Sequence, residues 1–500
     1  MSKGKPLKRV IFMVILVIDL SFSRFLRSVL IDERMEQTMA LKKNDIIPLE
    51  ITDITSEGNG VGRADGLAVF VPMAAVGDTL RVHITKVLKS YAYGIIEEIV
   101  APGAGRIAAD CSAFSRCGGC SYRHMSYEAE LGIKKKQVFD ALERIGGLHF
   151  EEQSIIPSPQ TEGYRNKAQY PVRADENGRC IAGFFAQRSH RLISCTDCTL
   201  QPKLFEEVTN EVLAFANRYS IPPYKEENGS GLLRHIYLRY AGAMGELMVC
   251  LVINGKNLPH AEILIQTLTE KFPQIKSMVL NFNRADTNVI LGERCTTLYG
   301  SDTITDILRG VKVRLSPLSF YQVNRLGAER LYEAVEEFAQ PKESDLLLDL
   351  YCGAGTIGLS MARKVHKLIG VEIVPEAVEN ARGNASLNDL NNCEFLCADA
   401  SGAAVELERR GTKPDIIILD PPRKGSDYEC LSAVVRMNPS RIVMVSCNPA
   451  TLARDLKQLE ELGYKAEKAK AVDMFPRTAH VECCCLLERS IKDRYHVPIL

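Results

Sequence analysis

The chain has 500 residues, enough for about three domains at roughly 150 residues each. Hydrophobic residues make up 46% and charged residues 25%, which excludes a largely disordered chain, a fibrous repeat and a multi-span membrane protein. The 62 basic side chains balance 62 acidic ones. Because nucleic-acid-binding domains usually carry a positive charge, composition alone argues against a polyanionic partner.

The amino-terminal segment has only some features of a signal peptide. A basic start precedes the apolar run from Val10 to Ile18, but charged residues follow it and no small-residue cleavage site appears. The run is also shorter than the roughly 20 residues that a membrane-spanning helix needs. Met39 opens directly into the first domain-like pattern. We therefore expect residues 1–40 to be a disordered or mis-started extension, and we expect no membrane partner.

Residues 41–101 are predicted to form a small β-barrel. Short runs rich in β-branched and apolar residues, such as LAVFVP at 67–72, alternate with glycine-rich turns. The segment resembles a TRAM domain, an OB-like module that holds RNA in other proteins. A generic small β-barrel would give the same pattern.

The rest of the chain divides into two predicted domains. Residues 102–330 are less regular and indicate a central α+β domain, in which LLRHIYLRY (232–240) and ELMVCLVING (246–255) predict a β-hairpin. From 331 to 500, apolar runs of strand length alternate with helix-like segments. This alternation predicts a doubly wound, mostly parallel α/β sheet, in which ligands bind beyond the carboxyl ends of the strands.

The first strands of this sheet end in residues suited to a nucleoside cofactor. DLYCGAGT at 349–356 places glycines after a strand, where the backbone can approach a ligand. Glu372 ends the second strand and could bind a ribose diol, and Asp399 ends the third, where an adenine amino group would lie. The DLYCGAGTIGL context favours S-adenosylmethionine over a dinucleotide. A tight turn without a ligand is the alternative for the glycines.

The later strands end in residues that can perform chemistry. The fourth runs into DPPRKG, which begins at Asp420, and the fifth runs into SCNP at 446–449. Cys447 precedes a new helix, whose amino end can stabilise a thiolate. A single cysteine is more often a small buried hydrophobe, but Cys447 shares its sheet edge with the predicted cofactor site.

A carboxylate completes this set. Glu482 closes DMFPRTAHVE (473–482) at the start of the final strand, where a solvated edge glutamate is the alternative. A thiol and a carboxylate together suggest methyl transfer to C5 of a pyrimidine, because a thiolate that adds to C6 makes C5 nucleophilic. A base must then remove the C5 proton before the thiolate can leave. Cys447 is the predicted nucleophile and Glu482 the predicted base.

These motifs, in this order, resemble those of the RNA uridine-5 methyltransferases over almost everything from Lys42 to the final strand. The resemblance is carried by SFYQVN (319–324), DLYCGAG, DPPRKG, SCNPATLARD and DMFPRTAHVE. Many relatives have Asn where this chain has Thr356. The resemblance also implies that Asp420 faces the target base. It implies that S-adenosylmethionine contacts Gln322, Tyr351, Thr356, Glu372, Asp399 and Asp420.

The cysteines suggest a second cofactor. Sixteen of them are spread along the chain, which favours a reducing, cytoplasmic setting over a secreted disulfide scaffold. The spacing of Cys111, Cys117 and Cys120, with a distant fourth thiol from the pair Cys195 and Cys198, fits either zinc or an iron–sulfur cluster. CGGC and DCTLQ resemble the ribosomal-RNA branch of the family, which implies a [4Fe-4S] cluster on Cys111, Cys117, Cys120 and Cys198. Cys195 would then be a bystander or an alternative ligand, and the cluster would have a structural or RNA-positioning role.

Residues 161–195 combine basic and aromatic side chains. Six basic residues stand against three acidic ones, with tyrosines and phenylalanines between them. Such a mixture suits single-stranded RNA, although a solvated strand face would look the same. The basic residues are Arg165, Lys167, Arg173, Arg179, Arg188 and Arg191.

We therefore expect a monomeric, cytoplasmic, S-adenosylmethionine-dependent enzyme that makes 5-methyluridine in 23S ribosomal RNA. Transfer RNA, or cytosine in place of uracil, would use related chemistry. Cytosine enzymes acting on RNA typically place cysteines in two strand-end motifs, and DPPRKG has none. A non-catalytic iron–sulfur RNA-binding protein is the alternative outside enzymes, and the pairing of Cys447 with Glu482 argues against it.

Overall fold

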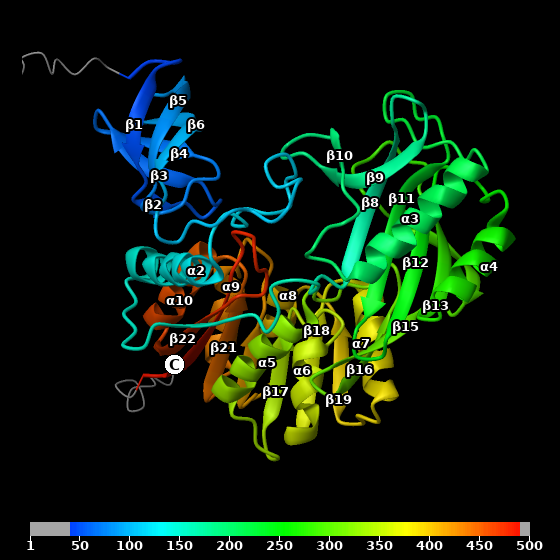
Figure 1. Cartoon of the computed structure of the whole chain (residues 1–500). Coiled ribbons are helices and arrows are strands. Elements are labelled where there is room, and N and C mark those ends of the chain that lie inside the picture. The colour runs from blue at the N-terminus through cyan, green and yellow to red at the C-terminus, as the bar shows by residue number, and fades with distance from the viewer. Residues whose placement is uncertain (1–40, 491–500) are drawn as a thin grey trace, which may run out of the picture. The chain divides into compact units, whose positions relative to one another are not determined.

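The computed structural model describes residues 41–490, shown in colour in Figure 1. These residues form two compact units, one made of 41–54 and 59–104 and the other of 55–58 and 105–490. The expected amino-terminal extension, residues 1–40, lies outside the described residues. No helix between residues 41 and 490 is both long enough and apolar enough to cross a membrane.

The smaller unit is a six-stranded sheet in the order β1-β5-β6-β4-β3-β2. Leu80, Val82 and Ile84 of β5 are buried and alternate with more exposed residues, because side chains along a strand point to opposite faces in turn. The predicted short strands are present, and within the described residues no ladder closes the sheet into a barrel. The strands are β1 (Ile46–Glu50), β2 (Asp53–Ile54), β3 (Gly60–Ala64), β4 (Leu67–Val71), β5 (Thr79–Val87) and β6 (Tyr91–Ala101).

In the larger unit, the first sheet has seven strands in the order β10-β9-β8-β11-β12-β13-β14. The predicted hairpin is confirmed as β11 and β12, which pair antiparallel with Tyr240 opposite Leu247. Helices α3 and α4 pack on one face of this sheet. The elements are β8 (Lys167–Ala174), β9 (Cys180–Phe185), β10 (Leu192–Ser194), α3 (Lys203–Arg218), β11 (Leu233–Ala241), β12 (Glu246–Ile253), α4 (Ala261–Lys271), β13 (Ile275–Phe282) and β14 (Arg294–Gly300).

The second large sheet has eight strands in the order β19-β18-β17-β20-β21-β23-β22-β7. The neighbouring strands β19, β18, β17, β20 and β21 run parallel to one another. Strand β23 lies between β21 and β22 and is antiparallel to both. The predicted doubly wound α/β fold is thereby confirmed. The strands are β17 (Leu346–Leu350), β18 (Lys367–Glu372), β19 (Cys393–Cys397), β20 (Ile416–Leu419), β21 (Arg441–Ser446), β22 (Tyr464–Val472), β23 (Glu482–Arg489) and β7 (Ser154–Ile156).

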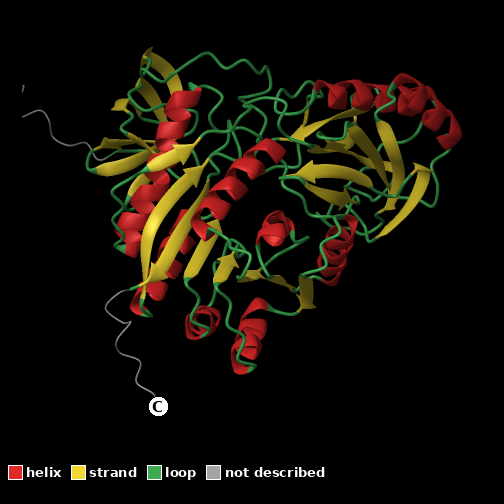
Figure 2. Ribbon diagram, turned by 90° about the horizontal axis from the view of Figure 1, so that it is seen from below, coloured by secondary structure: helices red, strands yellow, loops and turns green. Residues whose placement is uncertain are grey.

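Helices cover both faces of this sheet (Figure 2). Leu347 belongs to the core on one face and Leu348 to the core on the other, so the central strands are apolar almost throughout, whereas β22 near one edge alternates buried and exposed residues. One face is packed by α5 (Arg325–Ala339), α6 (Thr356–Met361) and α7 (Pro375–Leu387). The other is packed by α2 (Tyr127–Ala141), α8 (Ala400–Arg409), α9 (Tyr428–Arg436) and α10 (Pro449–Glu461).

The two large sheets share a core. Tyr237 and Cys250 of the seven-stranded sheet belong to the same buried cluster as Leu347 of the eight-stranded sheet. Between the sheets in sequence lies the two-stranded pair β15 (Ile304–Leu308) and β16 (Val311–Leu315), which also enters that cluster. In addition, β7 and α2 come from before residue 160 and complete the eight-stranded part. The chain therefore crosses between the two parts more than once.

Candidate active site

The carboxyl ends of the parallel strands meet at one edge of the eight-stranded sheet. Leu350 of β17 pairs with Val371 of β18 and with Leu419 of β20, and Leu419 pairs with Met444 of β21. The residues at and directly after these strand ends therefore lie along one edge. They include four predicted site residues, namely Tyr351, Glu372, Asp420 and Cys447.

The turn after β17 is shaped for a close ligand. Tyr351, Gly353 and Gly355 all have positive φ values, of 66°, 56° and 78°. Tyrosine rarely adopts this conformation, so the surrounding structure must enforce it. Glu372 holds the turn, because its Oε2 accepts a hydrogen bond from Gly353 N at 3.0 Å.

Asp349 lies beneath this turn with one oxygen unused. Its Oδ2 accepts a hydrogen bond from Gly358 N at 2.9 Å, whereas its buried Oδ1 has no hydrogen-bond partner within the described part of the chain. Burial raises the pKa of Asp349 to about 7. Gly353, Gly355 and Gly358 also have G-x-G-x-x-G spacing, so the glycines alone do not distinguish a dinucleotide from S-adenosylmethionine.

The remaining predicted cofactor residues occupy different positions around this edge. Thr356 starts α6, and its hydroxyl is 2.8 Å from the Tyr332 hydroxyl. Asp399 follows β19 and caps α8, accepting a hydrogen bond from Gly402 N at 3.0 Å. Gln322 lies just before α5.

Cys447 and Glu482 are brought together by strand register. Ser446 of β21 is the partner of Cys483 of β23 in an antiparallel ladder, so the next position sets Cys447 opposite Glu482. Cys447 is half-buried and Glu482 is 7% exposed. Asp420 follows the neighbouring strand β20 and acts electrostatically on both residues.

Burial dominates the protonation of these groups. It raises the pKa of Glu482 well above its ordinary value, and the neighbouring Asp420 raises it further. Burial also raises the pKa of Asp420 to about 7. The pKa of the Cys447 thiol is raised by burial and by Glu482. The expected stabilisation of a thiolate by the helix that follows is therefore outweighed by desolvation.

Sequence reasoning assigned no role to Arg423, the fourth residue of DPPRKG. Its guanidinium lies beside the Cys447 thiol, and its charge lowers the pKa of both Cys447 and Glu482 against the effect of burial. Its carbonyl accepts hydrogen bonds from Asn448 Nδ2 at 3.1 Å and Thr451 Oγ1 at 3.2 Å. Its position three residues after Asp420, at the same strand end, could have indicated that Arg423 lies at this site.

The cysteines predicted to hold a cluster lie near one another. The thiol of Cys120 interacts electrostatically with those of Cys117 and Cys198. The Cys198 thiol also interacts with those of Cys117 and Cys111. Between residues 41 and 490, no group of three or more His, Cys, Asp or Glu side chains is arranged to hold a metal ion. The four-cysteine set therefore stays a prediction.

Cys195 is more deeply buried than these four, although its thiol also interacts electrostatically with those of Cys198 and Cys111. It is buried with Ala113, Ala186 and Ile193 in a small apolar cluster, against which Cys198 packs only partly buried. Its thiol donates a hydrogen bond to Asp197 Oδ1 at 3.4 Å. Burial and the Asp197 carboxylate both raise the pKa of the Cys195 thiol.

Two of the basic side chains between 161 and 195 form ion pairs with acidic residues of the same chain. Arg173 pairs with Glu226 and lies over the Phe185 ring, 5.4 Å from its centre. Arg188 pairs with Glu57 at 3.4 Å. Burial lowers the pKa of Lys167 to about 8.

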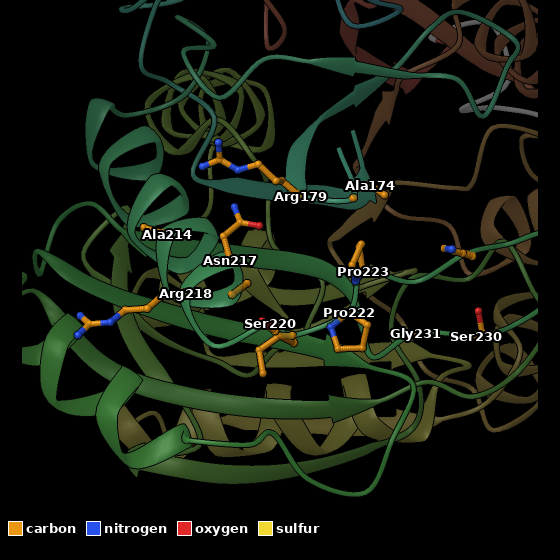
Figure 3. Close-up of a pocket in the computed structure, with 14 residues that line it drawn as sticks. Ala174, Arg179, Ala214, Asn217, Arg218, Ser220, Pro222, Pro223, Ser230 and Gly231 are labelled. Carbon is orange, nitrogen blue, oxygen red and sulfur yellow. The ribbon is translucent and has the colours of Figure 1, made fainter. Parts of the chain in front are cut away.

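One pocket in the seven-stranded part lies among other residues altogether (Figure 3). It has a volume of about 770 Å³, and none of the predicted catalytic, cofactor or cluster residues line it. Of the six basic residues between 161 and 195, it includes Arg179 alone. The pocket therefore adds nothing to the candidate active site.

Comparison with known proteins identifies the family of the chain. The family model for tRNA (uracil-5-)-methyltransferase matches residues 126–490, and the TRAM domain model matches residues 41–96. The chain is 42% identical over 454 residues to an uncharacterized RNA methyltransferase of Halalkalibacterium halodurans, covering 91% of this chain and 99% of that one. A second such protein, from Clostridium tetani, is 40% identical over 453 residues, covering 91% and 98%.

A solved structure shares most of the fold. The crystal structure of the Pyrococcus abyssi tRNA (uracil-54, C5)-methyltransferase, in complex with S-adenosyl-L-homocysteine, matches with a TM-score of 0.71 and 27% identity. The match covers 88% of this chain and all of that chain. The chain belongs to the tRNA (uracil-5-)-methyltransferase family and carries a TRAM domain.

The first prediction concerns Arg423. Replacing it with Met removes the cation that favours the Cys447 thiolate, so the thiol pKa should rise and alkylation by iodoacetamide at pH 8 should slow about three- to tenfold. Mass spectrometry of the Cys447 peptide across a pH series measures this rate. Lys424→Met is the matched control and should leave the profile unchanged. An unaltered profile in Arg423→Met would show that Arg423 does not influence this thiol.

Proposed function

We propose that this protein methylates C5 of a uridine in 23S ribosomal RNA, using S-adenosylmethionine. The observation that carries the proposal is the β21–β23 register, which sets a half-buried thiol opposite a buried carboxyl at the ligand-binding edge of the sheet. Its membership of a uracil-5 methyltransferase family supports the same chemistry.

The strand edge fits S-adenosylmethionine. Asp349 keeps a buried oxygen free to accept a hydrogen bond, and the turn at Gly353 leaves the backbone open to close approach. Binding of S-adenosyl-L-homocysteine by the P. abyssi relative supports the same ligand class here. Bound S-adenosylmethionine would supply an electrophilic methyl group. Gln322, Tyr351, Thr356, Glu372, Asp399 and Asp420 are the proposed contacts.

The chain's own residues would then perform three steps. The Cys447 thiolate forms an Sγ–C6 bond with the uracil, which breaks the C5–C6 double bond and makes C5 nucleophilic. After C5 has been methylated, the Glu482 carboxylate takes the C5 proton. The C5–C6 double bond re-forms as the Sγ–C6 bond breaks, and the thiolate is regenerated. The uridine must leave its stack to reach this edge.

Two RNAs remain as candidate substrates. The CGGC and DCTLQ motifs, which resemble the ribosomal-RNA branch, favour 23S ribosomal RNA. Similarity to a tRNA (uracil-54, C5)-methyltransferase and the name of the matching family favour transfer RNA as the second candidate. The TRAM domain and the basic residues near 161–195 would contact either RNA.

We also propose a [4Fe-4S] cluster on Cys111, Cys117, Cys120 and Cys198. Two observations fit this group. The thiols act on one another electrostatically, and the buried Arg123 side chain, which also pairs with Asp110, lies beside the Cys120 thiol and lowers its pKa against the effect of burial. The cluster would supply a structural crosslink, and these residues would hold it.

The cellular setting and the domain division are proposed on the same grounds. All sixteen cysteines are free, which suits a reducing cytoplasm, and we propose a monomer. The proposed domains are TRAM at 41–101, central at 102–330 and catalytic at 331–500.

The second prediction tests substrate and nucleophile together. The purified protein, incubated with labelled S-adenosylmethionine, should methylate a 23S ribosomal RNA transcript at C5 of uridine and leave transfer RNA transcripts unlabelled. Cys447→Ala should lose this activity while still binding S-adenosylmethionine, because the thiol is not among the proposed cofactor contacts. Label on transfer RNA alone would select the second candidate. Normal turnover by Cys447→Ala would refute the assigned nucleophile.

The third prediction concerns Glu482. Glu482→Gln should still form the covalent RNA adduct but should release it about 10²- to 10⁴-fold more slowly, because Gln cannot accept the C5 proton. Denaturing gels measure adduct formation and decay. In the wild type, release should slow as the pH is lowered, and the slowing should begin at a higher pH than for an ordinary Glu. The reason is that the raised pKa of Glu482 lets the carboxyl take up a proton earlier as the pH falls. Release at the wild-type rate would point to another base.

The fourth prediction separates the cluster ligands. Cys198→Ala should lower the iron bound per chain and the visible absorption of anaerobically purified protein, because it removes a proposed ligand. Cys195→Ala is the matched control and should retain both, since Cys195 bonds to Asp197 instead. Equal iron loss in the two variants would make Cys195 a ligand, and no iron in the wild type would exclude the cluster.

A further inference from the structure

The loop between β22 and β23 ends at Glu482, the proposed base. Residues 473–481 connect β22 to β23, and Val472 pairs with Glu482 where the loop begins and ends. We call these nine residues the base loop. Because the loop leads directly into Glu482, its conformation bears directly on where that carboxyl lies.

A fully buried ion network holds the start of the base loop. Lys134 of α2 donates hydrogen bonds from Nζ to Glu130 Oε1 at 2.6 Å, to Asp473 Oδ1 at 2.7 Å and to the Phe475 carbonyl at 3.0 Å. The side chains of Lys134, Glu130 and Asp473 are all 0% exposed. Tyr127 OH adds a hydrogen bond to Asp473 Oδ2 at 2.8 Å.

Hydrogen bonds also hold the middle of the base loop, at Pro476 and Arg477. Arg477 has a φ of 69°, unusual for a residue with a side chain, and its N–H donates to Glu130 Oε1 at 2.7 Å. The Arg477 carbonyl accepts hydrogen bonds from Ser121 N at 2.8 Å and Tyr122 N at 3.1 Å. Tyr164 OH donates to the neighbouring Pro476 carbonyl at 2.8 Å. Groups far apart in sequence thus converge on one loop.

The composition of this network points to positioning rather than to stability alone. Replacing a buried ion pair with apolar side chains of similar volume often costs nothing, so buried charge is weak evidence for a stabilising role. Here the Lys134 ammonium group donates two of its three hydrogen bonds to the base loop, one to the Asp473 carboxylate and one to the main-chain carbonyl of Phe475. Directional hydrogen bonds to the main chain fix a loop conformation in a way that apolar packing does not.

We propose that Lys134, with Glu130, Asp473 and Tyr127, positions the base loop so that Glu482 meets the C5 proton. This inference rests on the proposed function. Lys134 is a positioning residue, because it acts through the loop. Disturbing it should therefore slow proton removal more than it slows adduct formation or cofactor binding.

The test compares Lys134→Met with Lys136→Met. Lys136 lies on the same helix, in an exposed pair with Asp140. In Lys134→Met, adduct with 23S transcript should form at close to the wild-type rate and decay on the order of 10- to 100-fold more slowly, as expected for a displaced catalytic group. Hydrogen exchange at the non-proline amides of 474–481 should speed up, while exchange in α4, which belongs to the seven-stranded part, stays unchanged. Lys136→Met should match the wild type in both measurements.

Tyr164→Phe provides a second route, because it removes one hydrogen bond to the base loop without leaving a buried charge unpaired. It should give smaller changes in adduct decay and in hydrogen exchange. If Lys134→Met does not fold, Tyr164→Phe alone tests whether these contacts position the base loop. Wild-type decay and exchange in whichever variant folds would overturn the positioning role. Failure of the wild type to form any adduct would instead overturn the proposed function, while the exchange data would still report whether Lys134 orders the loop.

Discussion

The antiparallel pairing of β23 with β21 is the constraint on which the candidate site depends. In a sheet that is otherwise parallel around its centre, β23 runs the opposite way and brings its first residue to the edge where β21 ends. This direction sets Glu482 opposite Cys447. A one-residue slip in the ladder would turn the carboxyl to the other face of the sheet, because side chains alternate along a strand. Both cores fix that register, since Cys484 packs on one face and Cys483 on the other.

The same edge concentrates acidic groups away from water. Asp349, Asp420 and Glu482 all have raised pKa values, and burial is the first cause in each case. A fold selected for stability alone would avoid several desolvated carboxyls within reach of one another, so the arrangement points to chemistry. The charge of Arg423 opposes the effect of burial on both the Cys447 thiol and the Glu482 carboxyl. For the proposed reaction, Arg423 therefore favours the deprotonated forms that the nucleophile and the proton acceptor need, while burial still holds both pKa values above their ordinary range.

The sequence predicted the parts that depend on local pattern. The central strands β17, β18, β20 and β21 were found because they are buried on both faces and so stand out as apolar runs, as with Leu347 and Leu348. The strand β7 was missed because three residues show no period. Lys134 was missed because it lies in a run of three lysines that looks like a solvated helix face. Its burial depends on Asp473, 339 residues further along, which no local pattern contains.

The zero net charge takes on a different meaning in the folded chain. Some cations that could have met phosphates have internal partners, among them Lys134 in the core and Arg173 beside Glu226. Cations engaged in this way release few counterions on binding RNA, so general attraction to a polyanion should be weak. In the proposed reaction, selectivity would then come from geometry, because only an RNA that presents an unstacked uridine could bring its C5 to the proposed nucleophile Cys447 and the proposed base Glu482.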